Sequence, residues 1–393
     1  MNHAASKRHS GWSRRHFLGT AGAASVGTGL VGLRPTWAKA ADSDAAEKAV
    51  VGIARGSSME DATRKAVELS GGMDFIEPDQ VVLIKPNCTG GARRPTTTDP
   101  EVLYAVIKLA AERGPRRILV SDRCFSPVFR PDTPKTVDVM EKVGHLDAVN
   151  QAISDCKAPV VAVGLERPEE IFEELGVPAD TPAWRRVKPE GAEHWPNGFE
   201  LAELLFQADH VINVPVIKTH FQAWFTMSMK SFVGMSSHDT RREFHGAFKG
   251  NNSLFDQKAP GARRRRGRDG RRLDVEEVEP MVNRVAELNL GLAPSLNIMD
   301  GTESFVFGGP SDGDTVEPKL IVASRDRIAA DATGIAVLKR YGTERRLQRY
   351  SPWENPFIQH GIEIGLGIDS AEKINLKHAG MDDDIELVKE NLV

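Results

Sequence analysis

Cysteine is scarce in this chain of 393 residues, which has only Cys88, Cys124 and Cys156. The three are widely spaced, and no two of them form a Cys-x-x-Cys pair. The sequence therefore excludes a disulfide framework and a self-contained zinc or iron–sulfur site built from cysteine. A metal ion is a possible cofactor, but other side chains would have to hold it, and the sequence does not identify the cofactor.

Long apolar runs are also missing. No segment after the first forty residues reaches about 18 consecutive apolar residues, the length that crosses a bilayer as a helix. The stretch from Leu18 to Leu33 is apolar, but it is short and rich in glycine and alanine. We therefore expect a soluble mature protein with no stable membrane anchor.

Acidic residues are absent from the first forty positions, which carry six lysines and arginines. Residues 13–18 read Ser-Arg-Arg-His-Phe-Leu, a weakly apolar stretch follows, and Ala38-Lys39-Ala40 is a small-x-small cleavage site. This order predicts a twin-arginine signal peptide over residues 1–40, cleaved near Ala40. The twin-arginine translocase would then be a partner, and the protein would be periplasmic or otherwise exported. The alternative is a disordered basic tail.

An excess of positive charge is lacking from the body of the protein. The whole chain has a net charge of −4, and removing the six positive charges of the leader leaves −10. Nucleic-acid binding depends on neutralising phosphates, so an acidic body argues against a nucleic-acid partner. Residues 261–272 are an exception, because they contain seven arginines. We interpret them as a mobile, solvated surface loop, with an anion or partner contact as the alternative.

Several catalytic signatures do not occur. No Gly-x-Gly-x-x-Gly or Walker-type element follows an expected strand, so the sequence gives little support to nucleotide binding. No Gly-x-Ser-x-Gly elbow is present either, which argues against a standard serine hydrolase.

Short buried runs instead alternate with helical patterns along the chain. This alternation predicts an α/β fold, a mostly parallel sheet with helices on both faces, in a single large domain over residues 41–393. The expected strands are 50–53, 81–85, 117–121, 159–163, 210–216, 296–299 and 320–323. The expected helices are 59–70, 100–113, 136–143, 146–152, 200–206, 276–290 and 327–341.

Polar side chains follow these strands. In open parallel sheets, ligands bind beyond the carboxyl ends of the strands, so we expect the site at that edge. The residues that follow the strands include Lys85, Asn87, Asp122, Lys218, His220, Asp300 and residues 324–326.

The lysines of this set, together with Lys230, suggest an anionic ligand. Lys218 and His220 directly follow a buried strand, and Lys230 lies one loop later. Two lysines near one strand end suit a carboxylate or a phosphate. Lys85 and Asn87 would hold an anionic group or a metal-bound oxygen. We expect Lys218→Ala to abolish ligand binding at a cost within about 1 kcal/mol of stability, as for a surface residue.

The histidines allow a metal site as an alternative. His220, His238 and His245 are weak candidates for metal ligands, because their spacing fits no common zinc motif and the nearby lysines would repel a cation. Asp300, in a Met-Asp-Gly segment, is a candidate general base, a metal ligand or a turn residue.

At these residues the chain resembles the family named Domain of Unknown Function 362. The resemblance lies in ordered blocks at residues 82–87, 97–102, 118–122, 212–220, 229–234, 296–301 and 323–331. It implies that Lys85, Asn87, Lys218, His220, Lys230 and Asp300 are the site residues to test. Some members carry an added ferredoxin-like segment with closely spaced cysteines, which this chain lacks. Electron transfer through built-in clusters is therefore not expected.

These observations leave three hypotheses about function. The first is an exported enzyme acting on a small anionic molecule, which Lys85, Lys218 and Lys230 bind while His220 or Asp300 moves a proton. The second is a periplasmic protein that binds, or helps to mature, a metal or cofactor without turnover. The third is an interaction module that works through the Arg-rich loop at 261–272.

Overall fold

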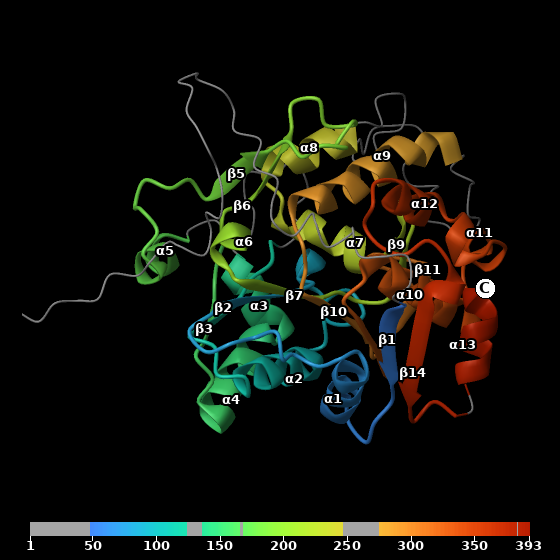
Figure 1. Ribbon diagram of the computed structural model, residues 1–393, viewed down its shortest axis with the longest axis horizontal. Coiled ribbons are helices and arrows are strands. Elements are labelled where there is room, and N and C mark those ends of the chain that lie inside the picture. The colour runs from blue at the N-terminus through green and yellow to red at the C-terminus, as the bar shows by residue number, and fades with distance from the viewer. Residues whose placement is uncertain (1–47, 124–135, 166–167, 247–274, 383) are drawn as a thin grey trace, which may run out of the picture. The chain divides into compact units, whose positions relative to one another are not determined.

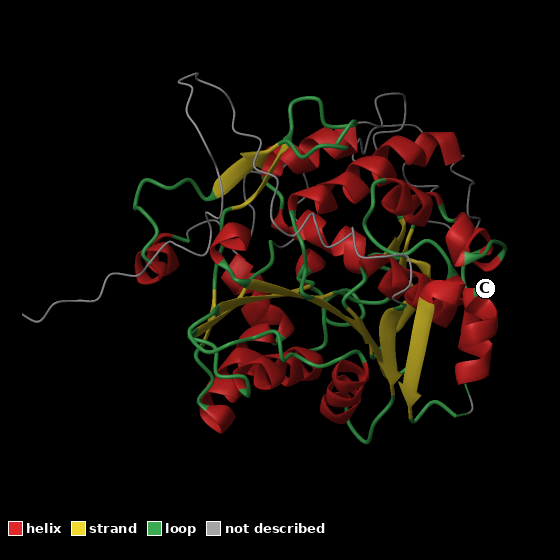
Figure 2. Ribbon diagram, in the orientation of Figure 1, coloured by secondary structure: helices red, strands yellow, loops and turns green. Residues whose placement is uncertain are grey.

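The computed structural model describes residues 48–123, 136–165, 168–246, 275–382 and 384–393, all of which belong to one compact unit. An eight-stranded sheet runs through this unit, with helices on either side (Figure 2). The predicted signal peptide at 1–40 and the Arg-rich loop at 261–272 lie outside the described residues.

The predicted sheet is confirmed, and it is mostly parallel. In spatial order its strands are β14 (Ile374–Ala379), β1 (Ala49–Ala54), β13 (Leu320–Ser324), β10 (Leu296–Gly301), β7 (His210–Val214), β2 (Val81–Pro86), β3 (Arg117–Val120) and β4 (Val160–Ala162). β13 is the exception, because it runs antiparallel to both of its neighbours, β1 and β10. Every other pair in the sheet is parallel.

The direction of β13 corrects one expectation about the site. Ser324, at its carboxyl end, pairs with Asn297 near the start of β10 and with Val51 near the start of β1. Residues 324–326 therefore lie beside the starts of β10 and β1, and not at the carboxyl end of β10, which carries Asp300. A buried apolar run has the same appearance in either direction, so the sequence does not reveal the reversal.

Both faces of the sheet are buried, which explains why its strands are nearly continuous apolar runs. Successive side chains point to opposite faces. Val81 and Leu83 of β2 join the hydrophobic core on one face, whereas Val82 and Ile84 join the core on the other. The sheet therefore lies between two separate cores, each covered by helices.

One face is covered by the N-terminal helices, as Figure 1 shows. These are α1 (Met59–Leu69), α2 (Pro100–Ala111), α3 (Thr136–Val143) and α4 (His145–Cys156). The side chains of Ser58 and Asp99 cap α1 and α2 by accepting from backbone N–H groups, as expected for residues of these types.

The other face carries most of the later helices. They are α5 (Glu169–Leu175), α6 (Leu204–Gln207), α7 (Ser228–Ser231), α8 (His238–Gly246), α9 (Val275–Leu288), α10 (Arg327–Arg340), α11 (Arg345–Gln348), α12 (Pro356–Glu363) and α13 (Ile385–Leu392). α10 packs directly on β13 and β10, and α13 packs on α10. None of the helices within the described ranges has both the length and the apolar character needed to cross a membrane.

Three two-stranded ribbons complete the fold. They pair β5 (Trp184–Val187) with β6 (Phe199–Ala202), β8 (Lys218–His220) with β9 (Trp224–Thr226), and β11 (Ser304–Gly308) with β12 (Gly313–Val316). The expected helix over 200–206 was therefore wrong in its first half. Phe199 and Leu201 of β6 are buried and the strand pairs with β5, so tertiary packing overrides a local helical pattern there.

Candidate functional site

Six ionisable side chains gather at the carboxyl edge of the sheet, and we call them the strand-end cluster. They come from the ends of β2, β3 and β10, from the ribbon strand β8, and from α7 and α8. Four are cationic and two are acidic. The members are Lys85, Asp122, Lys218, Lys230, Arg241 and Asp300.

Lys85 and Asp122 form a buried ion pair, with 2.9 Å between Lys85 Nζ and Asp122 Oδ1. Lys85 Nζ also donates to Ser231 Oγ at 2.9 Å and to the Pro86 carbonyl at 3.0 Å, so all three of its protons have acceptors. Asp122 Oδ2 accepts from Cys88 N at 2.7 Å. Lys85 therefore joins the ends of β2 and β3 to α7 and contributes fixed positive charge.

Lys218 is buried, which contradicts the expectation that it behaves as a surface residue. Its Nζ donates to the carbonyls of Thr96 at 2.6 Å and Pro310 at 3.0 Å. Burial and the charge of Lys230 lower the pKa of Lys218 well below its ordinary value, while Asp300 opposes the shift. This ammonium is therefore easier to deprotonate than an exposed one.

Asp300 lies at the end of β10 and is also buried. Its Oδ2 accepts from Asp99 N at 2.7 Å, and its Oδ1 accepts from Thr302 N at 2.8 Å. Burial raises the pKa of Asp300 to about 6, although the hydrogen bonds from Thr302 and Asp99 act in the opposite direction. Asp300 can thus change its protonation state close to neutral pH.

Asn87 holds the loop between β2 and α2 in place. Its side-chain oxygen accepts from Thr89 N at 3.0 Å and from Thr89 Oγ1 at 2.6 Å, while its backbone N donates to Thr98 Oγ1 at 2.8 Å. Thr98 Oγ1 in turn donates to the Val214 carbonyl at the end of β7. Asn87 is therefore part of the scaffold that places Asp99 against Asp300.

Lys230 differs from the other cations, because it is only partly buried and no hydrogen bond or ion pair engages its ammonium within the described part of the chain. Burial, followed by repulsion from Arg241 and Lys85, lowers the pKa of Lys230 to about 8. Arg241 is held in place by a hydrogen bond of 3.0 Å from its Nε to the Val233 carbonyl.

His220 is two residues beyond Lys218 in β8, so both side chains lie on the same face of the ribbon, about 7 Å apart along the strand. Its Nδ1 accepts from Gln222 N and Ala223 N, each at 3.1 Å. The proton of a neutral His220 ring must therefore be on Nε2. The structure brings His220 to the same edge of the sheet as the lysines.

The three-histidine metal site stays a prediction. His238 begins α8 and is partly buried, and the side chain of His245 lies outside the described residues. Among the side chains that the structure describes, one group of three has the types and proximity needed to hold a metal ion, and neither His220 nor His238 belongs to it.

The sequence did not indicate a thiol–imidazole pair that lies beside the cluster. Cys88 Sγ lies 3.3 Å from His145 Nδ1, and His145 Nε2 lies 2.8 Å from the Thr98 carbonyl. Both side chains are buried, and burial lowers the pKa of His145. A neutral His145 that donates from Nε2 to the Thr98 carbonyl accepts a hydrogen bond from the Cys88 thiol at Nδ1. The two residues are 57 positions apart, so no local spacing could have indicated the pair.

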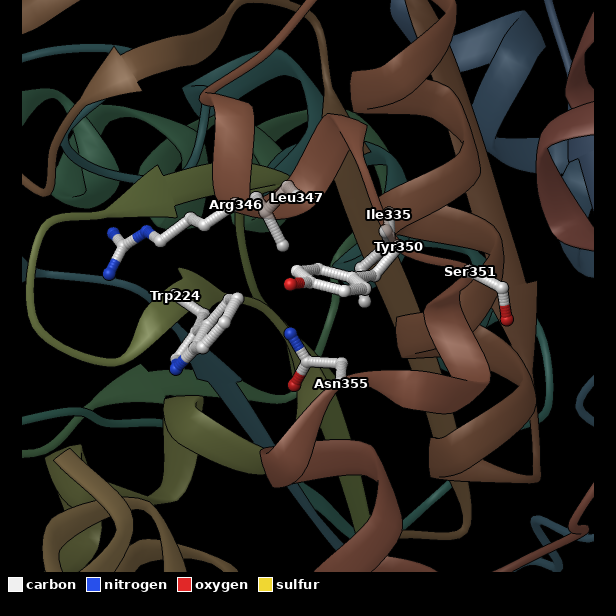
Figure 3. A pocket seen from close by; sticks show the side chains of 7 residues that line it. All are labelled: Trp224, Ile335, Arg346, Leu347, Tyr350, Ser351 and Asn355. Carbon is white, nitrogen blue, oxygen red and sulfur yellow. The ribbon is translucent and has the colours of Figure 1, made fainter. Parts of the chain in front are cut away.

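A small hollow beside the β8–β9 ribbon is shown in Figure 3. It is too tight to enclose even a water-sized molecule, so it is far smaller than the roughly 300 Å³ of the smallest usual ligand pockets. It is lined by Trp224, Ile335, Arg346, Leu347, Tyr350, Ser351 and Asn355. Arg346 links it to the site, because Arg346 Nη2 donates to the His220 carbonyl at 2.7 Å. None of the lining residues belongs to the strand-end cluster.

The fold is that of an α/β protein with a predominantly cationic cluster at the carboxyl edge of a mixed sheet. This chain belongs to the family described as Domain of unknown function (DUF362), whose model matches residues 82–336. The match includes every residue of the strand-end cluster as well as Asn87 and His220.

Similar proteins match over parts of their length. The thylakoid-associated protein of Synechocystis sp. is 27% identical over 271 residues, which are 68% of this chain and 66% of that protein. The lactate racemase apoprotein from Thermoanaerobacterium thermosaccharolyticum is 15% identical with a TM-score of 0.37, over 72% of this chain and 55% of that one. A protein from Thermotoga maritima is 16% identical with a TM-score of 0.38, over 68% and 55%.

Proposed function

We propose that this protein is an exported enzyme that acts on a small anionic substrate at the strand-end cluster. Lys230 contacts the anion, with Lys218 and Lys85 supplying positive charge behind it. Asp300 or His220 transfers a proton to or from the substrate.

The observation that carries the proposal is the state of Lys230. It is the cation of the cluster that is only partly buried, and no acceptor engages its ammonium within the described residues. Two carboxylates, Asp122 and Asp300, lie among four cations, so a bound anion would offset an excess of positive charge. Repulsion from Arg241 and Lys85 contributes to the lowered pKa of Lys230, and a bound anion would relieve this repulsion.

The pKa of Asp300 supports proton transfer. A general base works best when its pKa lies near the working pH, and Asp300 is raised to about 6. Strongly shifted groups that gather at one edge of a sheet are typical of functional sites. Export rests on the leader, with the arginine pair at Arg14 and Arg15 as its central feature.

Calorimetric titration of the mature protein with sulfate and with acetate tests the anion site. We expect saturable binding of at least one of them, and Lys230→Gln should weaken it at least tenfold. Lys389→Gln is the matched control, because Lys389 is exposed on α13. Equal affinity in the Lys230 variant and the control would remove Lys230 from the site.

Screening of small carboxylates and phosphate esters for product formation tests the enzyme. An Asp300→Asn variant that binds the substrate but forms no product would support proton transfer by Asp300. Saturable binding without product for any ligand would overturn the enzyme proposal and favour the binding or maturation protein.

Export is tested separately by replacing both arginines of the pair with lysine. We expect Arg14→Lys/Arg15→Lys to leave the protein in the cytoplasmic fraction of a host that has the twin-arginine pathway. Unchanged periplasmic recovery of the variant would contradict the assignment of the leader.

A further inference from the structure

A second group of potential ligands lies outside the strand-end cluster, and we call it the His–Glu–His cluster. It consists of His194, from the loop between β5 and β6, Glu287 of α9 and His360 of α12. We propose that these three side chains bind one divalent transition-metal ion, with Zn²⁺ as the first candidate.

The ligand atoms already converge. His194 Nδ1 lies 2.5 Å from Glu287 Oε1, and His360 Nε2 lies 3.2 Å from the same oxygen. Zinc binds imidazole nitrogen and carboxylate oxygen at about 2.0–2.2 Å, so two ligand atoms on a tetrahedral zinc are about 3.3 Å apart. All three ligand atoms lie within 4.8 Å of one another. Side-chain movements of less than about 1 Å would bring the ligand atoms to the separations that a zinc ion needs.

The chemistry of the donor set fits a zinc-like ion. Two imidazoles and one carboxylate are a ligand set that proteins use for zinc, with the fourth position left to water or substrate. His194 has 34% of its side chain exposed, whereas Glu287 is fully buried. An ion could therefore enter from the His194 side and keep one position open.

Outer partners orient both imidazoles. His360 Nδ1 lies 3.3 Å from Glu363 Oε2, which leaves Nε2 to face the cluster. A carboxylate behind a ligating histidine is the usual way to fix its tautomer and raise its basicity. Asn283 Nδ2 lies 3.4 Å from His194 Nε2, and its amide can be turned to accept a proton from that nitrogen instead.

The buried charge of Glu287 also calls for a cation. Within the described residues, the ion-pair partners of Glu287 are the two histidines, with no lysine or arginine among them. A carboxylate with no exposed surface is costly unless it is paired or coordinates a metal. Either a protonated histidine or a metal ion must supply the positive charge, and the proposed ion would take that role.

The cluster joins segments far apart in sequence. His194 and Glu287 are 93 residues apart, and Glu287 and His360 are 73 apart. The Trp195 ring N–H also donates to the Arg284 carbonyl at 2.9 Å, which holds the same loop on α9. A bound ion would thus clamp this loop to α9 and α12.

Titration of the chelator-treated mature protein, purified without a tag or metal resin, with ZnCl₂ tests the proposal. We expect one zinc per chain by calorimetry and elemental analysis, and a rise in Tm on binding. Co²⁺ in place of zinc should give the visible absorption of a tetrahedral site. Glu287→Gln and His360→Gln should each weaken binding at least tenfold, and Glu363→Gln should weaken it less.

His378→Gln is the matched control, because His378 lies exposed on β14. His194→Gln is a third variant in case the buried Glu287 variant does not fold, since His194 is partly exposed. Zinc binding that is absent from the wild type, or equal in the control and in the folded cluster variants, would overturn the proposal. In that case the cluster would be a hydrogen-bonded carboxylate with a protonated histidine.

Discussion

Asp331 of α10 accepts a hydrogen bond of 2.6 Å from the backbone N of Ser228, the first residue of α7. Its other oxygen accepts from Met229 N at 3.1 Å. The carboxyl group of Asp331 thus satisfies two backbone N–H groups at the start of the short helix that carries Lys230. The helix α10 follows β13 directly and packs on α7.

We expect the buried carboxyl group of Asp331 to make the free energy of unfolding depend on pH. Burial raises the pKa of Asp331 to about 7, although the bonds from Met229 and Ser228 act against the shift. The folded protein therefore holds a proton that the unfolded chain releases near its ordinary pKa of 3.8. The stabilisation that this proton gives the folded protein is complete below pH 3.8 and is lost as the pH rises toward about 7.

In urea titrations, Asp331→Asn should make the change of stability between pH 4 and 7 flatter than in the wild type. The largest difference in slope for one proton is about 1.4 kcal/mol per pH unit. Parallel pH profiles of the two proteins would show that Asp331 has no raised pKa.

Anion binding should weaken as pH rises through about 8. The pKa of Lys230 is lowered to about 8, so its positive charge is present below that pH and lost above it. Sulfate is a suitable probe, because its own charge does not change in this range. Lys230→Arg keeps the charge at every pH used and should abolish the fall. An identical fall in the arginine variant would assign the pH dependence to another group.

Gly234 should tolerate no side chain. A methyl group at this position would meet Asp122 Oδ1 and would lie 3.0 Å from Lys85 Nζ. The buried ion pair would have to move, so Gly234→Ala should destabilise by about 1–3 kcal/mol and weaken anion binding. A double-mutant cycle with Asp122→Ala should show strong coupling, because the clashing oxygen is gone. Additive effects would mean that the methyl group is accommodated elsewhere.

Lys218 should matter for stability as well as for binding. Lys218→Met would leave the buried carbonyl of Thr96 and the partly buried carbonyl of Pro310 without this donor, at a cost of about 1–3 kcal/mol. Lys389→Met on the exposed face of α13 should change stability by less than about 0.5 kcal/mol. Equal unfolding free energies for the two variants would restore the view of Lys218 as a surface residue.

Much of the fold was predictable, because local signals determine it. Buried runs such as Val81–Lys85 indicated strands, and Asp99 with Pro100 marked the start of α2. The rule that ligands bind beyond the carboxyl ends of strands placed Lys85, Lys218 and Asp300 at one edge, where the structure has them.

The remaining features depend on contacts that no local pattern contains. The direction of β13 is set by its pairing with β1 and β10, and apolar runs carry no direction. Arg241 reaches the strand-end cluster from α8, whose sequence has only the polarity of an exposed segment. The three members of the His–Glu–His cluster are each more than seventy residues from the next, so their meeting is a property of the folded chain.

The position of β1 between β13 and β14 has a consequence for biosynthesis. Both partners of β1 come late in the chain, and Ser324 Oγ bonds to the Val50 carbonyl across 274 residues. At roughly 5–20 residues per second, the ribosome needs about 14–55 s to make that intervening stretch. During that time β1 lacks its partner strands β13 and β14. The strand β14, near the end of the chain, thus completes the sheet beside β1. The sheet can therefore be finished only when synthesis of the chain is almost complete.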